Sequence, residues 1–266
     1  MFPRLIHIYG PLWIQSYGVM IAIGFLAFLY CTYRHPLRKR LVSGEVYLNA
    51  VFLGLIAGIF GGRILFVLTD FREFASNWVD MFYPWIGGFS VLGSIIAVLV
   101  TVPLYLKKHI KQEGQVLVIF DLAGVYGPLM QSIARIGCFL AGCCYGVPVG
   151  GHVWWAVTFT DSVGSAPLCI ALHPAQIYSS LFLLGIFIVM RVLVANFMFR
   201  PGQLLFLYLI LESIERFSVD FFRGDRGALT YLLSQVQMIS IMLFAFALLG
   251  FLWVTLIQRK PAQYLR

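Results

Sequence analysis

The residues best suited to chemistry begin with a short stretch near the middle of the chain, residues 135–146, which reads RIGCFLAGCCYG. Arg135 follows the largely apolar segment 116–134, and the small residues after it allow the backbone to turn closely past a ligand. A fixed charge in such a segment is costly, so it needs a partner or a function. Two interpretations fit: a guanidinium that binds an anion, and a structural arginine whose head reaches a membrane interface.

Few other charged side chains interrupt the apolar segments. Four of them follow one another at spacings of four, four and three residues, which places them on one face of a helix. Such a stripe is either a self-neutralising set of ion pairs or part of a binding site. These four are Glu212, Arg216, Asp220 and Arg223, and the others inside apolar segments are Arg63, Asp121 and Glu215.

Three arginines lie near one predicted membrane face: Arg63, Arg135 and Arg223. A guanidinium presents paired donors that match phosphate, and it stays charged when partly buried. Three such groups converging would hold the phosphate of an anionic lipid. The carboxylates of Asp121 and Asp220 would then orient these guanidiniums.

Two further polar side chains lie at an expected helix start (His173) and inside the first predicted span (Tyr17). His173 precedes Pro174, a residue favoured in a first helical turn. A histidine there either transfers a proton near neutral pH or caps the helix. Tyr17 either donates its phenol to a phosphate or sugar hydroxyl, or packs between helices.

The cysteines give no indication of a metal site, because none has a nearby histidine at ligand spacing. No metal is therefore expected. Four of the five fall towards the predicted outer face, where a disulfide is possible, and small buried hydrophobic side chains are the alternative. These four are Cys138, Cys143, Cys144 and Cys169.

The elements that position these residues are expected to be membrane helices. The chain is 61% hydrophobic and 11% charged, against roughly 25% charged in an average soluble domain. Seven segments approach the roughly 20 residues that a span requires. We therefore predict an all-α membrane bundle of about seven helices, forming a single domain over residues 1–266. The segments are 12–33, 46–69, 86–106, 116–138, 174–197, 203–221 and 233–257, with close helix approach at Gly61-Gly62, Gly87-Gly88 and Gly93.

The basic residues predict the orientation of this bundle. Lysine and arginine collect in alternate connections and in the C-terminal tail, which places the N-terminus outside and the C-terminus in the cytoplasm. The net charge of +8 therefore fits a membrane topology better than nucleic-acid binding. The connection 139–172 has no lysine or arginine and is rich in aromatic residues, so it either covers a site from outside or lies on the interface. Arg223 and Arg226 fall outside against this rule, which suggests another purpose for them.

Taken in order, these motifs resemble the prolipoprotein diacylglyceryl transferase family, and the similarity covers nearly the whole chain. No single motif is specific, whereas their order and spacing together are. The matching residues are Tyr17-Gly18, Gly61-Gly62-Arg63, Gly87-Gly88 with Gly93, Asp121, Arg135 through Gly146, His173 through Tyr178, and Arg216 through Asp220 to Arg223.

The resemblance implies a multi-pass enzyme of the bacterial cytoplasmic (inner) membrane. It would transfer a diacylglyceryl group from phosphatidylglycerol to the lipobox cysteine of a preprolipoprotein, forming a thioether and releasing glycerol 1-phosphate. Its partners would be these two substrates and membrane lipids, with no cofactor and no nucleic acid, and we expect a monomer. The expected catalytic residues are Arg135, Arg216, His173 and Glu212, and the expected substrate-binding residues are Tyr17, Arg63, Asp121, Gln176, Asp220 and Arg223.

The chain departs from the family pattern where proton transfer is expected. Leu92 occupies the place of a histidine considered important for catalysis, and Glu212 stands where a functional tyrosine is often found. Cys138, Ala141 and Cys143 replace two asparagines and a glutamate. Either His173 or a carboxylate such as Glu212 takes the proton, or the chain uses another acceptor or binds lipid without turnover. A solute transporter is disfavoured, because the charges gather towards one membrane face.

Overall fold

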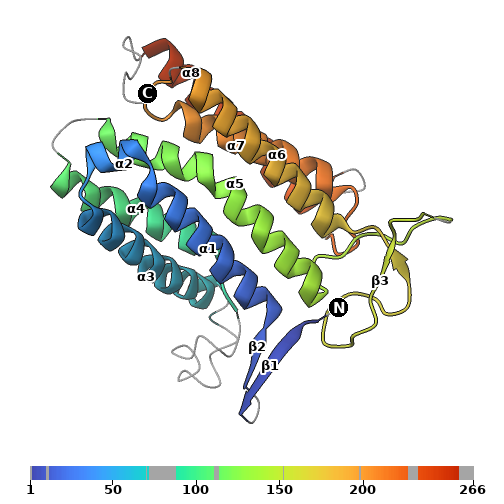
Figure 1. Ribbon diagram of the computed structural model, residues 1–266. Helices are drawn as coiled ribbons and strands as arrows, with labels where there is room; N and C mark the ends of the chain where they lie inside the picture. The colour runs from blue at the N-terminus through green and yellow to red at the C-terminus, as the bar shows by residue number, and fades with distance from the viewer. Residues whose placement is uncertain are drawn as a thin grey trace. The chain divides into compact units, whose positions relative to one another are not determined.

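The computed structural model describes residues 2–9, 12–69, 71, 88–110, 114–151, 153–197, 199–226 and 233–257, and these are mainly helical (Figure 1). The described residues contain eight helices and two small antiparallel sheets. The helices are α1 (Ser16–Arg34), α2 (Pro36–Leu41), α3 (Gly44–Thr69), α4 (Val91–His109), α5 (Gln115–Ala141), α6 (Ala175–Asn196), α7 (Gln203–Asp220) and α8 (Gln235–Ile257). The sheets pair β1 (Arg4–Tyr9) with β2 (Leu12–Gln15), and β3 (Val157–Thr158) with β4 (Ala171–Leu172).

Six of these helices are long and apolar enough to cross a membrane, namely α1, α3, α4, α5, α6 and α8. The predicted helical class is confirmed, with two small sheets beside the helices, and six of the seven predicted spans have the length and composition of a membrane helix. The remaining long helix, α7, has 18 residues. It differs from the six because it carries four charged side chains: Glu212, Glu215, Arg216 and Asp220.

Several predicted boundaries differ from the structure, two of them in ways that matter for the site. Residues 12–15, assigned to the first span, form β2, because they pair antiparallel with β1 and leave the helix to begin at Ser16. The fourth span, predicted to end near residue 138, extends three residues further. Helix α5 continues to Ala141, and the turn comes at Gly142, whose φ of +69° is in the left-handed region that suits glycine.

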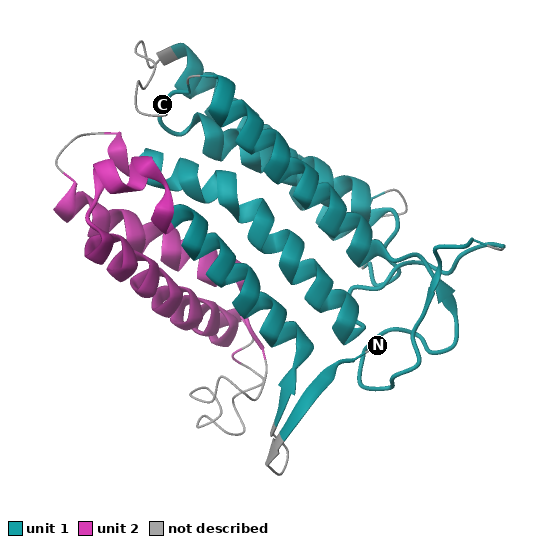
Figure 2. Cartoon of the chain, viewed as in Figure 1, with its two compact units in different colours: residues 1–32, 117–266 teal, residues 33–116 magenta. Residues whose placement is uncertain are grey.

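The chain divides into two compact units, residues 1–32 with 117–266 and residues 33–116 (Figure 2). In the first unit, α5 packs closely against α1 at Gly24 and Gly137: a Cβ on Gly24 would lie 2.8 Å from the Met130 carbonyl oxygen. Ser132 and Ser180 exchange hydrogen bonds between α5 and α6. Helix α7 packs against both α6 and α8.

The second unit consists mainly of α3 and α4, which pack against each other through small residues. A Cβ on Gly61 would lie 2.3 Å from the side chain of Ala97, and one on Gly93 would lie 2.3 Å from the Gly61 carbonyl oxygen. The predicted close helix approach at these glycines is therefore confirmed. Gly87 lies outside the described residues.

The connection after α5 is a folded part of the first unit. Phe159, Ala166 and Leu172 form its small buried core. Its first part is attached to the chain beyond α7, since Val147 N–H donates to the Phe222 carbonyl (2.9 Å) and Gly224 N–H donates to the Tyr145 carbonyl (2.9 Å). These bonds hold the end of α5 beside the end of α7.

Candidate functional site

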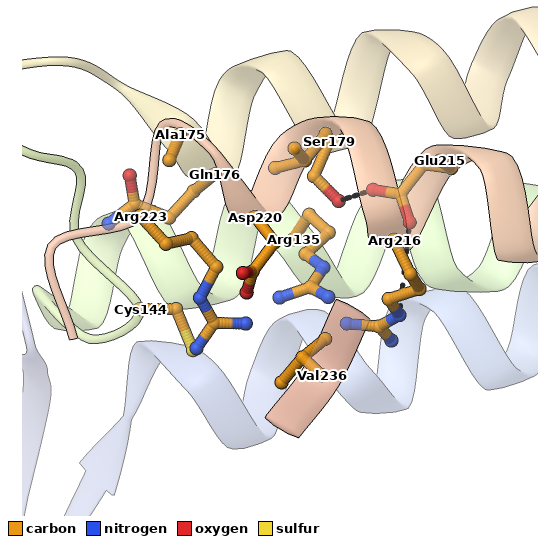
Figure 3. Close-up of a pocket in the computed structure, with 11 residues that line it drawn as sticks. Arg135, Cys144, Ala175, Gln176, Ser179, Glu215, Arg216, Asp220, Arg223 and Val236 are labelled. Carbon is orange, nitrogen blue, oxygen red and sulfur yellow. Dashed lines mark hydrogen bonds and ion pairs between the residues drawn. The ribbon is translucent and has the colours of Figure 1, made fainter. Parts of the chain in front are cut away.

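A polar pocket lies in the first unit, where the ends of α5, α6 and α7 meet (Figure 3). Each surrounding helix contributes side chains, as do the loop after α5 and the turn after α7. Three arginine guanidiniums point into the pocket from α5, from α7 and from the turn. The lining residues are Arg135, Cys144, Ala175, Gln176, Ser179, Glu215, Arg216, Val219, Asp220, Arg223 and Val236.

Arg135 is the arginine of this pocket that has no ion-pair partner among the described residues. It lies in the last two turns of α5, and it makes no hydrogen bond or salt bridge to any residue that the structure describes. Its side chain is only half-buried. An unpaired guanidinium in an otherwise apolar bundle is costly, and an anionic ligand would remove that cost.

Arg216 is held by carboxylates on its own helix. Its Nε lies 3.3 Å from Glu212 Oε1, one turn earlier, and 3.8 Å from Glu215 Oε2. Glu215 is buried and also accepts a hydrogen bond from Ser179 on α6. Of the four charged residues predicted to form a row of ion pairs, only Glu212 and Arg216 pair with each other.

Arg223 lies beyond the end of α7, so the prediction that it shares one helical face with Glu212, Arg216 and Asp220 was wrong. The helix ends at Asp220, and the chain turns to pair with the loop after α5. Arg223 forms a bidentate pair with Asp225, with both N···O distances 2.9 Å. These hydrogen bonds raise the pKa of the Arg223 guanidinium above its ordinary value.

Several buried acceptor atoms at the pocket have no hydrogen-bond donor among the described residues. Asp220 is fully buried, and its Oδ2 accepts from Ser234 Oγ (2.5 Å) while its Oδ1 has no donor. Gln176 donates its amide to the Cys143 carbonyl (2.8 Å), which leaves its Oε1 without a donor. Glu212 Oε2 and Glu215 Oε2 lack one as well. A ligand that carries hydroxyl groups would satisfy such atoms.

Besides Glu212, which pairs with Arg216 without lining the pocket, three predicted site residues of the first unit are placed elsewhere. Asp121, a residue of α5, is buried against the start of α7. Its carboxylate accepts hydrogen bonds from the backbone N–H groups of Gly202 (2.6 Å) and Leu205 (2.8 Å). Its carboxylate therefore stabilises a helix N-terminus instead of orienting an arginine. His173 lies just before α6, with its Nδ1 3.1 Å from the Tyr178 hydroxyl.

Tyr17, the third, lies in the first turn of α1 and is 40% exposed. Its backbone passes close to Gly137 of α5, since a Cβ on Gly137 would lie 3.4 Å from the Tyr17 Cα. This contact places Tyr17 beside the stretch that carries Arg135 and Cys138.

Two more of the residues singled out belong to the second unit. Arg63 is buried in α3 and donates to the Gly88 carbonyl (3.0 Å). Leu92, in the first turn of α4, is 61% exposed. The convergence of Arg63 with Arg135 and Arg223 stays a prediction.

The loop after α5 brings together three thiols that the sequence analysis did not combine. The Sγ atoms of Cys138, Cys143 and Cys144 all lie within 4.8 Å of one another. Hydrogen bonds with the thiols of Cys138 and Cys143, and then the guanidiniums of Arg223 and Arg135, hold the pKa of Cys144 well below its ordinary value. Cys144 is also part of the pocket wall.

Sequence reasoning also missed Ser179 and Glu215 as pocket residues. Glu215 was noticed only as an intramembrane charge, and Ser179 is an ordinary residue by type. One turn of helix separates Ser179 from Gln176, so the shared face of α6 was the available signal. The contact between Ser179 and Glu215 depends on how α6 packs on α7, which the sequence does not specify.

Comparison with known proteins gives a consistent result. The family model described as prolipoprotein diacylglyceryl transferase matches residues 3–253. The phosphatidylglycerol–prolipoprotein diacylglyceryl transferase of Clostridium tetani is 37% identical over 243 residues, covering 91% of this chain and 93% of that protein. The second such transferase of Clostridium perfringens is 33% identical, covering 86% of each chain. That of Thermotoga maritima is 28% identical, covering 95% of this chain and 85% of the relative.

Proposed function

This chain belongs to the prolipoprotein diacylglyceryl transferase family, and from that premise we propose that it transfers a diacylglyceryl group from phosphatidylglycerol to the cysteine thiol of a preprolipoprotein lipobox. The sulfur attacks the carbon of the diacylglyceryl group that bears the phosphate ester. A C–S bond forms, the C–O bond breaks, and the electron pair leaves with the phosphate oxygen of glycerol 1-phosphate. Such a displacement needs a thiolate and a site that stabilises the departing phosphate.

The free guanidinium of Arg135 carries this proposal. Arg216 and Arg223 each have a carboxylate partner, whereas Arg135 has no ion-pair partner among the described residues. A phosphodiester entering the pocket would find one unpaired cation and two partly neutralised ones. This arrangement supports roles for Arg135 in holding the transferring phosphate and for Arg216 and Arg223 in stabilising the charge that develops on it. Arg63 is proposed as a further phosphate contact.

The acceptor atoms of the pocket support glycerol as the head group. Asp220, Gln176 and Glu215 each leave a buried oxygen without a donor in the described part of the chain. The head group of phosphatidylglycerol carries two hydroxyl donors on the far side of its phosphate. We therefore assign these oxygens to the head group, with Tyr17 supplying a neutral hydrogen bond.

The proton of the acceptor thiol needs a destination. His173 and Glu212 are retained as proposed acid–base groups, although neither lines the pocket. Glu212 forms an ion pair with Arg216, one turn along the same helix. Asp121 is proposed to act indirectly, by fixing the start of the helix that carries Glu215 and Arg216.

In the membrane, we propose that α7 is a seventh span, with its charged side chains facing the pocket instead of lipid. The basic connections favour an outer N-terminus and a cytoplasmic C-terminus in the bacterial inner membrane. Connection 139–172 then lies on the outer side, where the lipobox of a translocated precursor is available. Both units are taken as one transferase domain acting as a monomer.

The test is incubation of the purified protein with phosphatidylglycerol and a lipobox peptide, followed by measurement of the peptide mass. We expect a diacylglyceryl adduct, and a loss of about 100-fold or more in kcat/KM for Arg135→Ala. Arg226→Ala is the matched control because Arg226 is exposed and lies near the same turn. An unmodified peptide from folded protein that still binds the lipid would indicate a lipid-binding protein instead.

A further inference from the structure

Three cysteines at the end of α5 form a compact thiol cluster. Cys138 lies in the last turn of the helix, and Cys143 and Cys144 follow in the loop. Their three Sγ atoms lie within 4.8 Å of one another. The expectation that the cysteines bind no metal rested on the absence of histidine partners, and here three thiols meet without one.

The size of the cluster suits a tetrahedral metal ion. Zinc binds thiolate sulfur at about 2.3 Å, which sets neighbouring sulfurs roughly 3.8 Å apart. The observed triangle has to contract by about 1 Å or less along each edge to reach that geometry. Thiolate ligands select soft or borderline ions such as Zn²⁺ over Mg²⁺ or Ca²⁺. Three protein ligands with one open position are typical of catalytic zinc sites, whereas structural sites have four.

The backbone holds the three thiols in place. Cys143 N–H donates to the Cys138 carbonyl (3.1 Å), and the Cys143 carbonyl accepts from the Gln176 amide (2.8 Å). Cys144 has a φ of +55°, which costs a non-glycine residue of the order of 1–3 kcal/mol. In this conformation the Cys144 Sγ lies within 4.8 Å of the other two sulfurs. The cluster is therefore positioned in advance of any ligand.

The charge around the cluster also favours a metal thiolate. Zinc with three thiolates has a net negative charge, and Arg135 and Arg223 line the same pocket as Cys144. In Figure 3 the Cys144 sulfur lies next to the Arg223 guanidinium. A metal at the cluster would thus stand beside the proposed phosphate site.

We propose that Cys138, Cys143 and Cys144 bind a zinc ion whose fourth position receives the thiol of the acceptor cysteine. This inference rests on the proposed function and deepens it. Zinc coordination deprotonates a thiol at neutral pH, so no protein base is needed at the position of Leu92. The thiol proton is released to solvent. The zinc-bound sulfur then attacks the diacylglyceryl carbon that bears the phosphate ester, and the electron pair of the broken C–O bond leaves with glycerol 1-phosphate. The thioether product is a weaker ligand than the thiolate and dissociates.

The first test is metal binding by the full-length protein in detergent. We expect about one zinc ion per chain for the wild type and for Cys31→Ser, and far less for Cys138→Ser. Cys31 is the matched control because it is a cysteine of the same unit that takes no part in the cluster. Cys143→Ser provides a second variant in case Cys138→Ser does not fold.

Cobalt reports the ligands directly. Co²⁺ in place of zinc should give the thiolate-to-cobalt charge-transfer band of a tetrahedral sulfur site. Adding a lipobox peptide should raise its intensity by about a third, because three thiolate ligands become four. A peptide with serine in place of the cysteine should leave the band unchanged. No bound metal, or a disulfide between two of the three cysteines, overturns the proposal.

Activity separates this proposal from the proposed function. Adduct formation that stops after chelation and returns with zinc supports both. Adduct formation that continues in metal-free protein keeps the transferase function and overturns the role of zinc. If zinc binds and the cobalt band responds to the peptide, yet no adduct forms under any condition, the zinc site stands and the proposed function fails.

Discussion

At the residue scale, the pocket differs from a simple phosphate site in its excess of acceptors. An arginine cluster alone binds any phospholipid with an accessible phosphate. The donor-free oxygens of Gln176, Glu215 and Asp220 add a requirement for hydroxyl donors, because a buried acceptor left unpaired costs about 1–3 kcal/mol. Selection of the lipid head group would therefore come from the carboxylates and the amide, and binding strength from the guanidiniums.

This argument predicts the effect of removing the head-group hydroxyls. With phosphatidyl-1-propanol, which keeps the phosphodiester charge and lacks both hydroxyls, we expect kcat/KM to fall by at least about tenfold relative to phosphatidylglycerol. The measurement is the rate of peptide modification in mixed micelles that hold each lipid at the same mole fraction. Equal rates for the two lipids would show that the donor-free oxygens of Gln176, Glu215 and Asp220 do not contact the head group.

At the element scale, the position of Arg135 depends on how α5 packs against its neighbours. Helix α1 approaches α5 at Gly24 and Gly137, where any side chain would collide with the facing helix. On another side, Asp121 anchors the N-terminus of α7 to α5 through two backbone hydrogen bonds. These contacts set the spacing between the helix that carries Arg135 and the helix that carries Arg216.

Two glycines of α1 give a matched test of this packing. A Cβ on Gly24 would lie 2.8 Å from the Met130 carbonyl oxygen, whereas one on Gly18 would meet nothing within 4 Å. We expect Gly24→Ala to destabilise the protein by about 1–3 kcal/mol. Gly18→Ala should be neutral or stabilising by up to about 1 kcal/mol, through helix propensity alone. Thermal unfolding in detergent measures both.

If Gly24→Ala unfolds at the same temperature as the wild type, the close approach of α1 and α5 is not maintained in detergent. A loss of activity without a loss of stability would mean instead that the helices separate and shift Arg135. The two glycines share one helix and one substitution, so propensity cancels in the comparison.

At the scale of the whole molecule, the apolar segments predicted the helices well because span length and hydrophobicity suffice to define them. Composition does not reveal where a helix stops, so the extension of α5 to Ala141 was missed, and so was the turn that takes Arg223 off the face of α7 after Asp220. Both ends are fixed by the hydrogen bonds between the loop after α5 and the turn after α7.

The site was predictable only as far as residue type implies chemistry. Arg135, Arg216, Arg223, Gln176 and Asp220 were predicted as site residues and meet in the pocket. The partner of Arg223 is Asp225 and the thiols form one cluster, and these facts depend on turns beyond the helices. Helical periodicity has no information about such turns.

The proposed orientation of the whole chain makes a prediction that labelling can test. Cys169 is exposed in connection 139–172, and Lys108 is exposed at the end of α4. An outer N-terminus places Cys169 outside and Lys108 in the cytoplasm, because the basic residues after α4 favour the inner side. A membrane-impermeant maleimide applied to intact cells should modify Cys169 and leave the cysteine of Lys108→Cys unmodified. Peptide masses identify the labelled site, and permeabilised membranes, where both should react, are the control. Labelling at position 108 in intact cells would reverse the orientation and place the arginine pocket on the cytoplasmic side, away from any translocated lipobox.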